Sequence, residues 1–122
     1  AGATNTRIGT DGDGINDIAE RNVISGNTEE GIQIEASSNT VVAGNFIGTD
    51  RDGIVARQNS FSGILVWDTA VNVRIGTDGS KGSNNTAERN LISGNLGGGV
   101  RVTQNAQDVR VAGNWLGLNA NG

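Results

Sequence analysis

The sequence predicts an all-β fold in which short parallel strands stack as the coils of a solenoid. Ile and Val supply 22 of the 122 residues against 5 Leu, and this bias toward β-branched side chains favours strands over helices. Gly and Asn, with 20 and 16 residues, favour turns. One pattern also occurs twice along the chain, and a shorter period lies inside it. Repetition at these lengths is the signature of a solenoid.

The long repeat recurs after slightly more than half of the chain. Residues 5–35 align with residues 72–103, at offsets of 67 and 68. Further on, residues 43–48 (AGNFIG) align with residues 112–117 (AGNWLG) at an offset of 69. Two single-residue insertions account for the drift.

Three short alternating segments make up each unit of the shorter period. The first, Gly-apolar-x-apolar, recurs after 32 and 36 residues and lies at residues 31–34, 63–66 and 99–102. The second lies at residues 40–44, 73–76 and 109–113, with an additional copy at residues 6–9. A third and weaker segment lies at residues 22–25, 59–62 and 90–93. We therefore expect three short strands in each coil and three to four coils in the chain.

The alternation of side chains assigns a face to each strand residue. The inner face of the first segment is expected to hold Ile32 and Ile34, Ile64 and Val66, and Val100 and Val102. The inner face of the second is expected to hold Ile8, Val42, Ile75 and Val111. Strands this short are unstable as isolated hairpins, so equivalent strands must stack in parallel, about 4.8 Å apart, to bury these residues.

Four Asn residues recur at the turns between the segments: Asn27, Asn45, Asn95 and Asn114. Asn tolerates left-handed backbone angles and bonds its own backbone. Stacked Asn side chains also form hydrogen-bonded ladders from coil to coil. We expect these residues to be structural and to hold no ligand.

The repeated strings Arg-Asn-(Val/Leu)-Ile-Ser-Gly-Asn, Gly-Asn-(Phe/Trp)-(Ile/Leu)-Gly and Gly-(Ile/Val)-x-(Ile/Val) resemble a known family. They are similar to the right-handed parallel β-helix repeats of large secreted and surface proteins of bacteria, within the pectin-lyase-like superfold. The resemblance implies a right-handed solenoid and a secreted or cell-surface location. It also implies that residues 1–122 are one β-helix domain, expected to be a segment of a longer repeat array. The superfold hosts many activities, so the resemblance does not specify one.

Missing residue types exclude much catalytic chemistry. Without His or Cys the chain has no Ser-His or Cys-His nucleophile pair and no imidazole or thiolate metal site. Relatives that cleave polysaccharides use paired aspartates with a His, or calcium-bound acids with an Arg or Lys base. Here the one Lys is Lys81, and the carboxylates left for glycoside hydrolysis are Asp50, Asp52 and Asp68. We expect a non-catalytic structural or interaction scaffold, with a carbohydrate-binding or polysaccharide-processing (lyase- or hydrolase-like) β-helix as the alternative.

One loop resembles a calcium loop of the thrombospondin type 3 or dockerin kind. Asp11, Asp13, Asp17 and Glu20 stand at positions 3, 5, 9 and 12 of such a loop, although position 1 is a Gly. The second copy, residues 78–88, lacks the middle acids. Calcium binding by these four carboxylates and a solvated acidic turn are both open interpretations.

The middle coil places Leu65 and Trp67 on the outer face of its first strand. Such a pair is consistent with packing under a loop, protein contact or stacking against a sugar. A net charge of −4 and a pI near 4.6 argue against nucleic acid, and no apolar run is long enough to span a membrane. Because the chain lacks Pro and its Lys lies in a loop, strand edges are unprotected. We expect self-association through the open ends or through the Leu65/Trp67 face.

Overall fold

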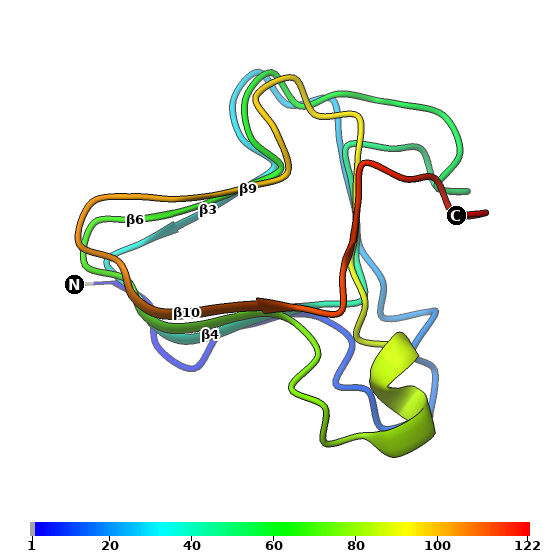
Figure 1. Ribbon diagram of the computed structural model, residues 1–122, viewed down its shortest axis with the longest axis horizontal. Coiled ribbons are helices and arrows are strands. Elements are labelled where there is room, and N and C mark those ends of the chain that lie inside the picture. The colour runs from blue at the N-terminus through cyan, green and yellow to red at the C-terminus, as the bar shows by residue number, and fades with distance from the viewer. Residues whose placement is uncertain (1) are drawn as a thin grey trace.

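The computed structural model describes residues 2–122 and folds them into a parallel β-solenoid, seen along its axis in Figure 1. The first coil holds β1 (Arg7–Gly9), β2 (Val23–Ile24) and β3 (Ile32–Glu35). The second holds β4 (Ser38–Ala43), β5 (Phe46–Ile47) and β6 (Ile64–Trp67), and the third holds β7 (Val71–Gly76), β8 (Leu91–Ile92) and β9 (Val100–Val102). A fourth coil begins with β10 (Gln107–Ala112) and β11 (Trp115–Leu116). A short 3-10 helix, η1 (Gly82–Thr86), lies in a loop of the third coil.

Equivalent strands of successive coils pair in parallel and form three sheets, confirming the predicted solenoid. Their orders are β1-β4-β7-β10, β2-β5-β8-β11 and β3-β6-β9. The predicted rows are in register: Ile32, Ile64 and Val100 align, as do Ile34, Val66 and Val102. Ile8, Val42, Ile75 and Val111 also align. Among residues 2–122, no helix is long and apolar enough to cross a membrane.

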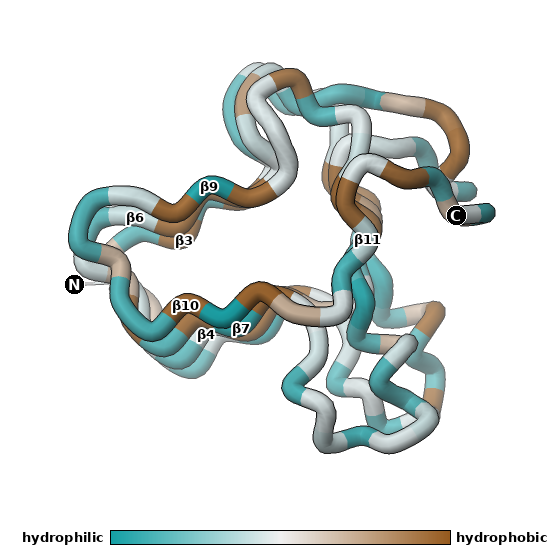
Figure 2. The backbone as a smooth tube through the Cα atoms, viewed as in Figure 1, coloured by the Kyte–Doolittle hydropathy of each residue, from teal (hydrophilic) through white to brown (hydrophobic). Residues whose placement is uncertain are grey.

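The apolar core lies between the sheets and is best enclosed in the second and third coils. Ile64, Val66 and Ile75 are completely buried, whereas Val111 in the fourth coil is 40% exposed. Figure 2 shows apolar residues alternating with polar residues along β9 and β10. Complete burial of one such side chain stabilises the fold by about 1.5–3 kcal/mol, so the second and third coils contribute most of the apolar stabilisation.

The prediction of a strand at residues 59–62 is wrong. The middle member of that sheet is β5, in which Phe46 pairs with Val23 on one side and Leu91 on the other. Residues 59–62 instead form the turn before β6, because residues 48–58 leave the coil as a loop. Asn59 therefore occupies a turn position, where its Oδ1 accepts a hydrogen bond from Asn27 at 2.8 Å.

Loop lengths explain why the clearest repeat is two coils long. The first coil inserts residues 10–22 between its first two strands, and the third inserts residues 77–90 at the same corner. In the second and fourth coils only residues 44–45 and 113–114 connect the equivalent strands. The chain thus alternates long and tight corners, and like corners recur after two coils. In Figure 1 the two long loops lie side by side at the lower right.

Two ladders of Asn side chains tie the coils together, as expected. Asn22, Asn45, Asn90 and Asn114 form one, with Nδ2–Oδ1 distances of 2.9, 3.1 and 2.9 Å. Asn27, Asn59 and Asn95 form the other, with distances of 2.8 and 2.7 Å. Nδ2 groups within both ladders also donate to backbone carbonyls, for example from Asn90 to Val42 at 2.8 Å. Each buried carboxamide is therefore paired, as its burial requires.

The four predicted turn residues do not use the left-handed backbone that Asn tolerates, because the preceding residue of each turn adopts it. The Gly before each of Asn27, Asn45, Asn95 and Asn114 has the positive φ, for example 75° at Gly44 and 69° at Gly113. Residues without a Cβ adopt these angles at little cost, so the Asn is free to keep a regular backbone and use its side chain in the ladder. A separate exposed row does combine both features: Asn5, Asn39 and Asn72 have φ of 56°, 56° and 55°.

Candidate functional site

The structure brings three of the four predicted calcium ligands together. One carboxylate oxygen from each of Asp11, Asp13 and Asp17 lies within 4.8 Å of the others. Turn geometry positions them: Asp11 accepts the N–H of Asp13 at 3.0 Å, and Asp13 accepts the N–H of Ile15 at 2.7 Å. Carboxylate oxygens are the ligands that Ca²⁺ prefers. The first long loop therefore has part of the donor set of a calcium site.

Glu20, the fourth predicted ligand, lies outside this cluster. Its Oε2 accepts the backbone N–H of Asp11 at 3.3 Å, so it braces the base of the loop. The carboxylate of Asp17 is also engaged, because it accepts the N–H of Gly14 at 3.1 Å and the hydroxyl of Thr10. The carboxylates of Asp11 and Asp13 are therefore more available than that of Asp17 to bind a metal ion.

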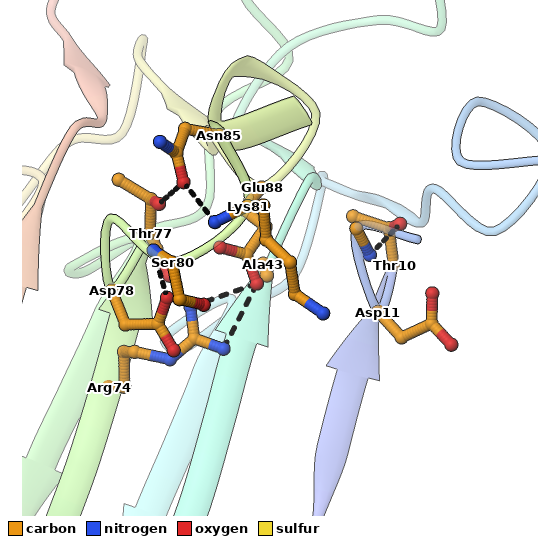
Figure 3. A network of polar contacts seen from close by, with 12 residues as sticks. Thr10, Asp11, Ala43, Arg74, Thr77, Asp78, Ser80, Lys81, Asn85 and Glu88 are labelled. Carbon is orange, nitrogen blue, oxygen red and sulfur yellow. Dashed lines mark hydrogen bonds and ion pairs between the residues drawn. The ribbon is translucent and has the colours of Figure 1, made fainter. Parts of the chain in front are cut away.

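The second long loop has the same turns but lacks the middle acids of the first. The side chain of Asp78 accepts hydrogen bonds from Ser80, and these bonds lower the pKa of that carboxyl. Asn85 Oδ1 accepts the Thr77 hydroxyl at 2.9 Å and the backbone N–H of Lys81 at 3.0 Å (Figure 3). Within residues 2–122, the cluster in the first loop is the one group of three or more metal-ligating side chains.

A buried ion pair that the sequence did not predict fixes the second loop to the sheet. Glu88 is completely buried, and its Oε1 accepts two hydrogen bonds from the guanidinium of Arg74 on β7, each at 3.0 Å. The other carboxylate oxygen of Glu88 has no hydrogen-bond partner. Figure 3 shows the pair between the two long loops, with the Asp11 carboxylate pointing away from it. Glu88 corresponds to the exposed Glu20 of the first loop, so the repeat alone gives no sign of its burial.

Leu65 and Trp67 lie on the outer face of the sheet β3-β6-β9, as predicted. Both are half-buried, and they line a groove of about 440 Å³ together with Phe61. In register with Leu65 stand Gln33 on one side and Arg101 on the other. The indole N–H of Trp67 is buried without a hydrogen-bond partner. The groove thus has an apolar floor within a polar surround.

The three carboxylates considered for glycoside hydrolysis, Asp50, Asp52 and Asp68, have separate roles in the loops. Asp50 accepts the backbone N–H groups of Ile54 and Val55 at 2.9 and 3.1 Å, and these bonds lower the pKa of its carboxyl. Asp52 pairs with the exposed Arg51 at 3.8 Å in the same loop. Asp68 lies at the corner between β6 and β7 with a left-handed backbone. Turn formation accounts for the geometry of Asp50 and Asp68.

Comparison with known proteins agrees with the stacked coils. The family described as "Right handed beta helix region" matches residues 5–122. No curated protein matches the chain, and no solved structure matches it. The match covers nearly the whole chain and supplies the handedness that the strand pattern alone leaves open. The chain belongs to the right-handed β-helix family.

Proposed function

We propose that this chain is a non-catalytic structural or interaction scaffold of a secreted or cell-surface protein, which assembles through the ends of its solenoid. The observation that carries the proposal is that the first and last coils formed by residues 2–122 leave the interior open, so that each can receive a further coil. At one end a hollow of about 190 Å³ is lined by Ile8 and Ile34. At the other a hollow of about 340 Å³ is lined by Ile92, Val100 and Leu116.

The strand edges at the two ends support head-to-tail contact. β1 and β10 are the outer strands of one sheet and β2 and β11 of another, so each edge offers unpaired backbone groups in the same parallel direction. The ladder ends offer matching groups as well, because Asn22 begins and Asn114 ends one row. A contact between unlike ends leaves two ends open, so it can repeat in a row of copies.

We expect the 122-residue chain to form dimers or larger species in light scattering at tens of micromolar. Val111→Lys places an inward-pointing charge on the last coil, which blocks stacking, and should yield monomers. Trp67→Ala, on the side of the solenoid, should leave the association unchanged. A wild-type chain that stays monomeric, or a loss of association in Trp67→Ala alone, contradicts assembly through the ends.

The groove at Leu65 and Trp67 supports a second candidate function, which is carbohydrate binding or processing. Aromatic side chains beside polar groups are typical of sites that bind small ligands. A glycan array with the wild type and Trp67→Ala, alongside an unsaturated-uronate assay on acidic polysaccharides, distinguishes the two functions. Glycan binding that Trp67→Ala abolishes favours the second candidate, and uronate release favours a lyase.

We also propose that the first long loop binds calcium through Asp11, Asp13 and Asp17. Calcium at 100 times its dissociation constant stabilises a folded chain by about 2.7 kcal/mol, so the melting temperature should rise by several degrees. Asp13→Asn should abolish the rise. Asp78→Asn in the second loop is the matched control and should keep it. If titration calorimetry detects no heat of binding at millimolar calcium, the proposal is wrong.

A further inference from the structure

The outer face of the sheet β2-β5-β8-β11 carries an arginine-lined groove. Its volume is about 490 Å³, and Arg21, Arg51 and Arg89 line it together with a single acid, Asp52. The chain as a whole has a net charge of −4, so this concentration of positive charge runs against its overall composition. Asp52 lies 3.8 Å from Arg51, which leaves Arg21 and Arg89 without an ion pair in the part of the chain that the structure describes.

Two repeated contacts hold each of these guanidiniums in place. Arg21 lies over the ring of Phe46 at 4.1 Å, and its Nε donates to the carbonyl of Gly44 at 3.1 Å. Arg89 repeats the arrangement, 4.6 Å over Trp115 with its Nε 3.2 Å from a carbonyl. Stacking and one hydrogen bond therefore fix the plane of each guanidinium. The four N–H donors on Nη1 and Nη2 of each group have no partner within residues 2–122.

Arg21 and Arg89 are both half-buried. Desolvation by this burial lowers the pKa of the Arg21 guanidinium. A fixed planar fork of N–H donors matches the oxygens of carboxylate, sulfate and phosphate groups in a bidentate manner. An anion in the groove therefore meets donors that no acceptor within residues 2–122 occupies.

We infer that this groove is a binding site for a small oxyanion ligand, carrying sulfate, phosphate or carboxylate groups, which Arg21 and Arg89 hold. The two arginines are copies of one position in the two-coil repeat, so they lie about 10 Å apart along the solenoid axis. A dianion that spans the groove meets both guanidiniums, and a single oxyanion meets one of them. The site is on a different sheet from the Leu65/Trp67 groove and involves none of the acids of the first long loop.

The test is titration calorimetry of the 122-residue chain with sodium sulfate, sodium phosphate and sodium succinate, against sodium chloride at equal ionic strength. We expect binding of at least one of the three, and the strongest identifies the preferred group. The double variant Arg21→Lys, Arg89→Lys keeps the charge but lacks the fork, so its affinity should fall at least tenfold. Arg101→Lys, on the outer face of β9, is the matched control and should bind as the wild type does.

A second measurement separates specific binding from general salt effects, because sulfate stabilises most proteins by exclusion from their surface. The Nε–H resonances of Arg21 and Arg89 should shift on titration, while that of Arg101 stays in place. Equal shifts at all three arginines, or equal affinities in the double variant and the wild type, overturn the site.

Discussion

Replacing Ile64 by Asp is expected to destabilise the chain by more than about 4 kcal/mol, which is a large part of the total stability of a domain this size. Ile64 is completely buried, and its neighbours in the stack are Ile32 and Val100. A carboxylate there would lie between two apolar layers without a partner, and burial of an unpaired charge carries a high free-energy cost. Urea unfolding followed by circular dichroism measures the change.

The next residue of the same strand provides a matched control. Leu65 points outward from β6 between Gln33 and Arg101, so Leu65→Asp should cost less than about 1.5 kcal/mol. Ile64→Val keeps the inner face apolar and should cost about 0.5–1.5 kcal/mol. If the two Asp variants are equally unstable, then the alternation of inner and outer faces does not determine stability in this coil.

The sequence predicts this core because its signal is short and repeated. Ile64 and Val66 alternate with outward residues over four positions, and equivalent pairs recur in the neighbouring coils. Two independent patterns thus specify the same inner face. One is the alternation of inward and outward residues along the strand, and the other is the recurrence of that alternation in successive coils. The third sheet is harder to predict, because its strands are only two residues long and alternation needs more residues than that.

Alternating loops account for the errors in that sheet. Asn45 is the last residue of a tight corner and Asn22 is the last residue of a long loop. Their local sequences therefore differ, although their side chains stack. Asn59 shares an Asn-x-x-Ser spacing with residues 22–25, and this local likeness placed it in the wrong row. Which Asn residues form one ladder depends on how the coils stack in three dimensions. Loops of variable length make that stacking impossible to derive from the local sequence.

Local sequence patterns also fail to predict contacts between coils. Arg21 meets Phe46 across 25 positions, and no local motif connects them. Residues 117–122 show no strand pattern in the sequence. The N–H of Ala120 nevertheless donates to the carbonyl of Gly53 at 2.8 Å, because the segment stacks on the loop of the second coil. Both contacts follow from the two-coil repeat once the stacking is known.

Removal of Arg74 is expected to have the second large effect. The side chain of Arg74 is 16% exposed and that of Glu88 is completely buried, so Arg74→Met leaves a carboxylate in the interior without its counter-charge. Breaking a buried pair in this way costs about 3–5 kcal/mol. Arg110 occupies the same row one coil further on, is exposed, and has no acidic partner among residues 2–122. Arg110→Met should therefore change the free energy of unfolding by less than about 0.5 kcal/mol.

The Arg74–Glu88 pair also joins three parts of the fold, so its removal should destabilise segments beyond β7. The backbone carbonyl of Glu88 accepts the N–H of Gly44 at 3.0 Å, in the tight corner of the second coil. A Cβ on Gly12, in the first long loop, would lie 2.8 Å from the Cγ of Glu88, so the two loops are in close contact. We expect Arg74→Met to increase hydrogen exchange in both loops, and Arg110→Met to leave it unchanged.

A double variant tests whether charge or packing is responsible. Replacing Glu88 by Leu in the Arg74→Met chain removes the unpaired carboxylate, and an apolar pair of similar volume is often as stable as the ion pair or more so. We therefore expect the double variant to recover most of the lost stability in urea unfolding. The unpartnered Oε2 of Glu88 strengthens this expectation, because one half of the carboxylate is desolvated without a hydrogen bond in return. If the double variant is as unstable as Arg74→Met, the loss comes from the packing of the arginine side chain, and the ion pair contributes little to holding the loops in place.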